Sequence, residues 1–227
     1  MPSSGCSPVA PWRVISLSEV RPLADPEVAR PLRKDAARNR KRLLAAAGDV
    51  FDAQGLDASV ADVARAAGVG MGTLYRRFPT KEALIDALVH EVLEATIEMA
   101  RESANRADGT GLEDFLRISS AFQAAHPGCL PKLWNTDHDM VKTARSLIGE
   151  LLADAQRQHK VRHDLSGTDV TLLMWSVRGI VESTRSVAPT AWQRHLDVLL
   201  AGIRPSSEDL AHRPVTRKQL DAILEHG

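Results

Sequence analysis

The chain has few cysteines and no long apolar run, and each shortage removes a class of protein. Its two cysteines, Cys6 and Cys129, cannot build the disulfide framework of a small secreted domain and fit a reducing compartment. No stretch reaches the roughly 18 apolar residues that a membrane-spanning helix needs. The first residues also lack the cationic segment and sustained apolar core of a secretory signal peptide. We therefore expect a cytoplasmic protein that is neither secreted nor in contact with a membrane.

Catalytic and metal-binding signatures are missing as well. The chain has no glycine-rich phosphate loop and no H-E-x-x-H motif, and its eight histidines are scattered without a partnered nucleophile. Cys129 has His126 three residues before it, but prolines on both sides indicate a packed loop rather than a catalytic pair. Residues 137–139 (Asp, His, Asp) cannot all face one ion, so they fit a helix cap better than a metal site. We expect no catalytic residue, no metal and no cofactor.

The formal net charge of zero hides an asymmetry along the chain. Residues 30–81 contain eleven Lys or Arg against five Asp, a balance of +6, whereas residues 82–227 contain sixteen against twenty-one acidic residues, a balance of −5. A basic segment joined to an acidic one suits a protein that meets phosphate with one end only. The alternative is that the basic run at residues 30–42 is merely the solvated face of a helix.

Residues 59–81, SVADVARAAGVGMGTLYRRFPTK, have the pattern of two short helices joined by a tight glycine turn. Ser59 is placed to cap the first helix. Gly68 is placed to reverse the chain, because glycine adopts a positive φ without a steric penalty. Leu74 and Phe78 would anchor the second helix to the first. The spacing is that of a helix-turn-helix, although an ordinary helical hairpin also carries small residues around a glycine turn.

The rest of the chain is helical in pattern, with no alternating strand signature longer than a few residues. We expect an all-α fold whose first helix covers residues 35–54 and whose Thr80 caps a long helix that links head to body. Further helices are predicted over residues 112–125, 139–159, 168–187 and 189–202, with a short one from Thr216. The predicted organisation is a disordered, proline-containing arm (residues 1–31), a helix-turn-helix head (32–80), a helical body (81–204) and a tail (205–227).

The stretches RNRKRLLAAAGDVFDAQGLDAS and VADVARAAGVGMGTLYRRFPTKEAL resemble the DNA-binding domain of the tetracycline-repressor (TetR) family of bacterial transcription regulators. The likeness covers roughly residues 38–90, through a helix ending in F-x-x-x-G, the ARAAGV turn and GTLYRRF-x-x-K-E-x-L. It implies a three-helix DNA-binding domain followed by a helical domain for ligand sensing and dimerisation. The implied function is a ligand-responsive regulator, by default a repressor that a small molecule releases from a near-palindromic operator. The alternative is an activator or a ligand-independent DNA-binding protein.

The second helix of the motif and the helix starts on either side of it carry the residues expected to meet double-stranded DNA. The Tyr75 hydroxyl is suited to donate to a phosphate, and a phosphate near Lys81 would offset the repulsion between this cation and the helix dipole. Ser59 and Thr73 either contact the DNA backbone or act as caps. Because glycines have no polar side chain, base readout is expected from Arg76, from Met71 against a thymine methyl and from close backbone approach. The predicted DNA-binding residues are Ser59, Met71, Gly72, Thr73, Tyr75, Arg76, Arg77 and Lys81.

The resemblance also implies a homodimer formed through the helices over residues 168–187 and 189–202. In DVTLLMWSVRGIVES apolar residues surround the helix almost completely, so it is buried on more than one side, which a core helix explains equally well. Gly179 is unfavourable in a helix interior and suggests another helix packed closely against it. A symmetric dimer reads two inverted half-sites about 34–36 Å apart, or a multiple of that distance.

An unidentified small-molecule effector is the remaining expected partner. Apolar side chains of the body would line its pocket, with one polar group to orient it. Each of these residues is more often part of a plain core than of a pocket, and Arg178 has Glu182 four residues away as a partner. The predicted pocket residues are Met99, Phe115, Phe122, Trp134, Met140 and Trp175, with His138 or Arg178 as the polar group.

Overall fold

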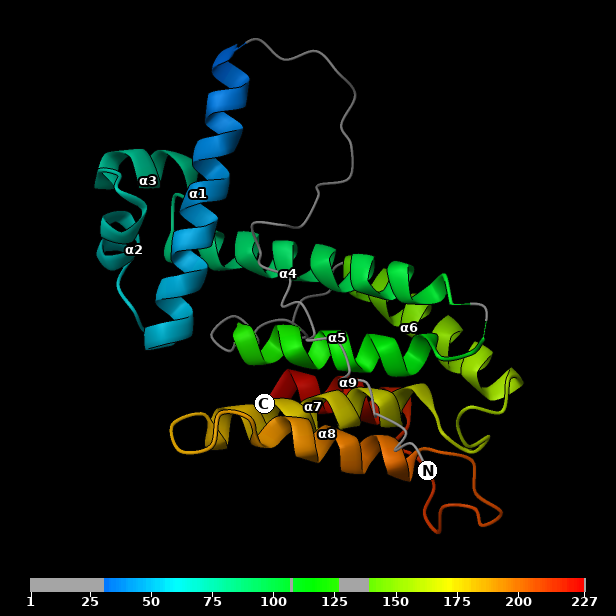
Figure 1. The fold of residues 1–227 in the computed structure, drawn as a ribbon. Coiled ribbons are helices and arrows are strands. Elements are labelled where there is room, and N and C mark those ends of the chain that lie inside the picture. The colour runs from blue at the N-terminus through cyan, green and yellow to red at the C-terminus, as the bar shows by residue number, and fades with distance from the viewer. Residues whose placement is uncertain (1–30, 107, 127–138, 227) are drawn as a thin grey trace, which may run out of the picture.

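The computed structural model describes residues 31–106, 108–126 and 139–226, and all regular elements in these residues are helices (Figure 1). A head stands at one end, and the first helix of the body runs out of it. The head consists of α1 (Pro31–Gln54), α2 (Val60–Ala67) and α3 (Met71–Arg77). The body consists of α4 (Lys81–Ala104), α5 (Gly111–Ala125), α6 (Asp139–Arg157), α7 (Gly167–Thr184) and α8 (Ala191–Gly202), with α9 (Arg217–His226) after it.

The head folds around one small apolar core. Leu43, Phe51, Val63 and Leu74 are completely buried there, so each of its three helices contributes to the core. Helix α1 begins at Pro31, four residues before the expected start, because proline is tolerated in the first turn of a helix. It ends at Gln54, as expected, before a glycine in the left-handed conformation.

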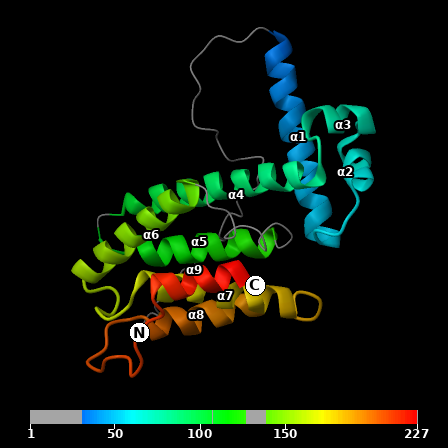
Figure 2. The same ribbon diagram turned by 180° about the vertical axis from the view of Figure 1, so that it is seen from behind.

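The body is layered, with α4, α5 and the α7–α8 pair one below the other (Figure 2). Helix α4 contacts α5, α6 and α1, and α5 in turn contacts α6, α7 and α8. The apolar row of α4 faces this interior and is buried, as its spacing predicted. No helix in the described parts of the chain is both long and apolar enough to span a membrane. The buried row comprises Leu84, Ile85, Leu88, Val89, Val92, Leu93 and Ile97.

Three helix ends of the body differ from the sequence prediction by two or more residues. Helix α6 stops at Arg157, two residues early, and His159 then adopts a left-handed φ of 51°. Helix α7 stops at Thr184, where the amides of residues 187 and 188 turn back onto the Thr184 carbonyl. Helix α8 starts at Ala191 rather than Pro189. These ends are set by hydrogen-bonded turns, which hydrophobic spacing does not encode.

The segment after α8 is anchored to the body. Arg162 donates to the Asp164 carboxylate at 2.5 Å and to the Glu208 carbonyl at 2.7 Å, and Asp164 accepts the Leu210 amide at 2.7 Å. The hydrogen bond from Arg162 is the main reason that the pKa of Asp164 lies far below its usual range. Leu220 of α9 is completely buried. The segment predicted as a tail therefore folds back onto the helices that precede it.

Candidate DNA-binding interface

The turn between α2 and α3 is fixed by the residues that the sequence singled out. Ser59 caps α2, since its Oγ accepts the Asp62 amide at 3.1 Å and donates to the Asp62 carboxylate at 2.6 Å. This donation is the largest cause of the lowered pKa of Asp62. Gly68 has a φ of 66°, and the next amide returns to the Ala64 carbonyl. The capping role of Ser59 and the turn at Gly68 are confirmed.

Helix α3 has one buried side and one open side. Leu74 is completely buried and Phe78, which follows the helix, is 5% exposed. On the open side Met71 is 38% and Tyr75 46% exposed. A Cβ added at Gly72 would meet nothing within 4 Å, so the glycine lies on the open surface and leaves the helix backbone accessible.

The cationic residues around α3 differ in how they are held. Arg76 folds back along its own helix, because its Nε donates to the Gly72 carbonyl at 3.0 Å and its Nη2 lies 3.4 Å from Thr73 Oγ1. Arg77 is exposed, and Lys81 is the first residue of α4. Within the described residues neither Arg77 nor Lys81 has a recorded ion-pair partner. Arg77 thus faces solvent, and Lys81 is half-buried.

Arg40 of α1 is a functional candidate that the sequence reasoning missed. Its guanidinium lies 5.9 Å from the centroid of the Phe78 ring and 3.3 Å from the Glu91 carboxylate of α4. Burial raises the pKa of Glu91, and Arg40 opposes that rise. Arg40 thus joins α1, the end of α3 and α4. The basic run around Arg40 was visible in the sequence, but its partner lies 51 residues away.

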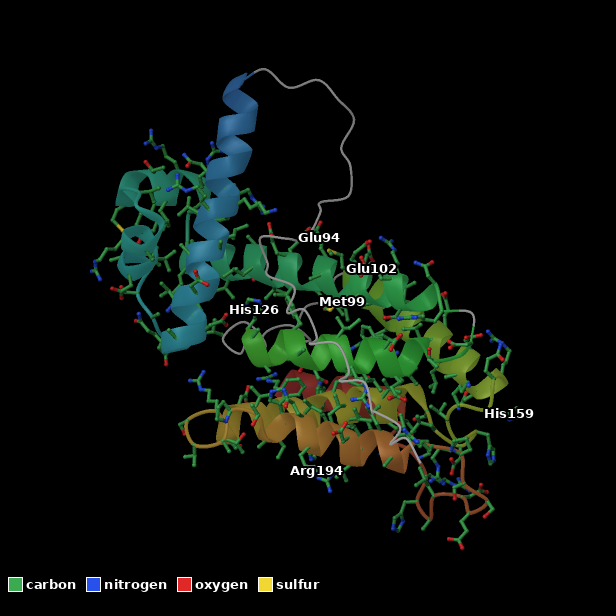
Figure 3. All side chains as sticks on the ribbon, viewed as in Figure 1. Glu94, Met99, Glu102, His126, His159 and Arg194 are labelled. Atoms are coloured by element: carbon green, nitrogen blue, oxygen red, sulfur yellow. The ribbon has the colours of Figure 1, made fainter. Side chains whose placement is uncertain are left out.

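The predicted pocket residues are spread over the body. Met99, Phe115 and Phe122 are buried core side chains, and Trp175 is half-buried. Arg178 Nε lies 2.7 Å from Glu182 Oε1, which is the alternative pairing that the sequence allowed. Trp134 and His138 lie outside the described residues. Met140 lines a cavity of about 230 Å³ between α4 and α6. Glu94, labelled in Figure 3, lines the same cavity. The remaining lining residues are His90, Ile97, Glu98, Arg101 and Thr143.

A second cavity, of about 270 Å³, lies at the end of the body that is remote from the head. It is formed where α5 begins, where α6 ends and where α8 ends, next to the His159 labelled in Figure 3. None of the predicted pocket residues lines it. Its lining includes Glu113, Lys160, Leu200 and Arg204.

Comparison with known proteins decides the family. A TetR transcription regulatory protein from Mycobacterium vanbaalenii is 35% identical to this chain, covers 77% of it over 99% of its own length, and superposes with a TM-score of 0.55. The chain belongs to the TetR family. A second TetR regulator, from Streptomyces coelicolor, is 30% identical over 74% of this chain and 99% of its own length, with a TM-score of 0.56.

The TetR assignment extends to both parts of the chain. Residues 43–88 match the bacterial regulatory proteins of the tetR family, and residues 107–205 match the C-terminal domain of SbtR-like transcriptional regulators. An HTH-type transcriptional regulator from Staphylococcus aureus (strain USA300) is 39% identical over 67 residues, which are 29% of this chain but only 36% of that protein. The chain thus matches about a third of that relative's length. The TetR fold and the class of helix-turn-helix regulators, rather than enzymes, are confirmed.

Proposed function

We propose that this TetR protein is a dimeric, sequence-specific regulator that docks α3 of each copy in the major groove of a near-palindromic operator. The observation that carries the proposal is the open side of α3, where a helix with exposed Met71, Tyr75 and Arg77 stands beside Lys81, the first residue of α4. Such a surface combines apolar, hydroxyl and cationic contacts. Phosphate contacts would position the helix, and base edges would specify the sequence.

Tyr75, Arg77 and Lys81 are the proposed phosphate contacts. Lys81 occupies the positive end of α4, where the helix dipole opposes a cation, so a phosphate at that place would remove an unfavourable interaction. Thr73 is a further hydroxyl donor at the same surface. Ser59 supports the interface as the cap of α2, because its hydroxyl is already engaged by Asp62.

Base readout is assigned to Met71, Gly72 and Arg76. Met71 offers an apolar contact for a thymine methyl, and Gly72 lets the helix backbone approach the base edges. Arg76 would exchange its bonds to Gly72 and Thr73 for a guanine edge or a phosphate. With so few polar side chains at the start of α3, part of the specificity would come from DNA deformability.

The proposed dimer interface is the outer face of α7 and α8. The residues of α7 buried in the chain lie on one side of the helix, whereas Leu172 and Trp175 lie on the other and are only half-buried. A Cβ added at Gly179, on that second side, would meet nothing within 4 Å. On α8, Val198 is 56% exposed. A second copy would cover these apolar side chains and give Gly179 a close helix contact, which none of the described residues provides.

The proposed effector site is the cavity between α4 and α6. Its floor is apolar, formed by Ile97 and Met140, and its rim is polar, with Glu94 and Arg101 among its residues. Helix α4 also begins with the DNA-facing Lys81, so a ligand that moves α4 would move the head. A coupling of a few kcal/mol is enough to release a repressor from its operator.

The test is fluorescence anisotropy with DNA from upstream of the protein's own gene and a scrambled duplex, measured across a salt series. We expect at least about a hundredfold tighter binding to the upstream DNA. Tyr75→Phe and Lys81→Ala should weaken binding, and Lys81→Ala should lower the log–log salt slope by about one unit per half-site. Arg157→Ala, which removes an exposed cation of the body, is the matched control and should change neither quantity. Equal, weak binding to both duplexes would refute the assignment.

A further inference from the structure

The C-terminal end of α1 is held by two side chains from the body. His126, which follows α5, places Nδ1 at 3.0 Å from Asp52 Oδ2, and both side chains are 14% exposed. Arg185, which follows α7, donates from Nη1 to the main-chain carbonyl of Asp52 at 3.2 Å. We call these three residues the Asp52 clasp. It joins segments that are 74 and 133 residues apart in the sequence.

The histidine of the clasp is fixed in place. Its ring packs on Phe122, one turn earlier in α5, with the ring centroids 4.8 Å apart, and its amide bonds to the Phe122 carbonyl at 3.0 Å. Figure 3 labels His126 at the end of α5 that faces the lower end of α1. Because a carboxylate only accepts hydrogen bonds, Nδ1 is the donor to Asp52. His126 thus connects the head to the body. Cys129, which the sequence analysis weighed as its catalytic partner, lies outside the described residues.

A second head-to-body contact lies higher on α1. Arg40 pairs with Glu91 of α4, and Arg40 and Asp52 are twelve residues, or about 18 Å, apart along the helix. Helix α1 also packs on α4, and the two polar contacts add to this packing. Two contacts 18 Å apart fix the direction of α1, and with it the direction of the helices that pack on it. The Arg40 contact ties the head to α4, whereas the clasp ties it to α5 and α7.

Helix α7 connects the clasp to the proposed dimer interface. Gly179 precedes Arg185 by six residues, which is about 9 Å along a helix. The position of the clasp relative to the two-fold axis is therefore set by a short, rigid element. We propose that the Asp52 clasp sets the angle between head and body and so determines the half-site spacing that the dimer recognises. His126 and Arg185 act as positioning residues, and the inference rests on the dimeric operator binding proposed above.

The test is selection from a pool of random 50-base-pair duplexes by the full-length protein, followed by sequencing. The readout is the distance between inverted half-sites in the enriched DNA, which a general loss of binding does not change. We expect the unaltered protein to enrich one spacing. For His126→Ala and Arg185→Ala we expect the same half-site sequence. Their preference for the original spacing over spacings one or two base pairs longer or shorter should be about fivefold weaker, which is at the lower end of typical coupling effects between sites in a protein.

Two variants serve as controls. His126→Asn keeps a donor near the position of Nδ1 and should retain the spacing preference. Arg106→Ala removes an ion pair with Asp114 inside the body, at 2.9 Å, and should also leave it unchanged. Arg185 is exposed, so Arg185→Ala carries the test alone if thermal melting shows that His126→Ala does not fold.

The outcomes separate this inference from the proposed function. If folded His126→Ala and Arg185→Ala proteins keep the full spacing preference of the unaltered protein, the clasp does not set head geometry and the inference is overturned. If the unaltered protein enriches no inverted repeat, dimeric operator binding itself is wrong, and the clasp proposal falls with it. A weaker spacing preference in Arg185→Ala but not in Arg106→Ala supports the clasp.

Discussion

The substitution Gly179→Ala should have opposite effects on the single chain and on the dimer. Glycine within a helix is about 1 kcal/mol less favourable than alanine, and no atom of the described residues lies within 4 Å of the added methyl group. The isolated chain should therefore become more stable by about 1 kcal/mol. If a second copy of α7 packs against Gly179, the methyl group overpacks the interface and costs about 1–3 kcal/mol in each subunit. At the lower limit of this range the two subunits together lose about 2 kcal/mol of dimerisation free energy, which raises the dimer dissociation constant about 30-fold.

Sedimentation velocity over a dilution series measures this dissociation constant, and thermal melting at the lowest concentration measures the stability of the chain. The matched control is Gly149→Ala in α6, where an added Cβ also meets nothing within 4 Å. That change should give the same stabilisation and leave dimerisation unaltered. If Gly179→Ala dimerises as tightly as Gly149→Ala, no helix approaches Gly179 closely and the proposed dimer face is wrong.

Three further substitutions test the fold that supports the interface. Leu74→Ala, at a completely buried position, should destabilise the head by about 2–5 kcal/mol and abolish DNA binding, measured by urea unfolding and anisotropy; an unfolding free energy within 1 kcal/mol of the original would contradict this. Ser59→Ala should cost about 1 kcal/mol through loss of the α2 cap, which Ser59→Thr should restore because it keeps a hydroxyl that accepts the Asp62 amide and donates to the Asp62 carboxylate. Because the pKa of Asp164 is lower in the folded state than in the unfolded state, its contribution to stability is full above the ordinary pKa of Asp, about 4, and is lost as the pH falls. Melting temperatures from pH 6 to pH 2 should therefore drop less steeply for Asp164→Asn, and parallel curves would count against the role assigned to Asp164.

Much of the fold was predictable because it depends on local signals. Ser59 and Thr80 each cap the helix they were expected to cap, with amides at 3.1 Å and 3.0 Å, since a hydroxyl before an apolar repeat satisfies amides that the helix leaves free. Gly68 adopts the left-handed conformation that the motif required. The ends of α6, α7 and α8 were less predictable, because turn hydrogen bonds decide them.

Less of the candidate site was predictable. The sequence named the residues of α3, but Arg76 bonded to its own helix and the ion pair of Arg40 with Glu91 emerge only in three dimensions. The pocket prediction gathered large apolar residues, and several of these fill the core. Met140 lines the cavity between α4 and α6 together with charged side chains of α4, and no sequence pattern indicated that these residues lie next to one another. The DNA contacts, the domain boundaries and the dimer helices remain predictions.

The sequence by itself determined the helical class, the helix-turn-helix and the basic character of the head, because caps, glycine turns and apolar spacing act over a few residues. Only the tertiary structure decided how the head is attached to the body. Asp52 and Arg185 carry no signal in the sequence, and His126 was noted there only for its spacing from Cys129. The three residues lie on three different helices or at their ends. Their contacts exist because packing of α1, α5 and α7 brings these ends together, and no local pattern encodes an encounter between segments more than 70 residues apart.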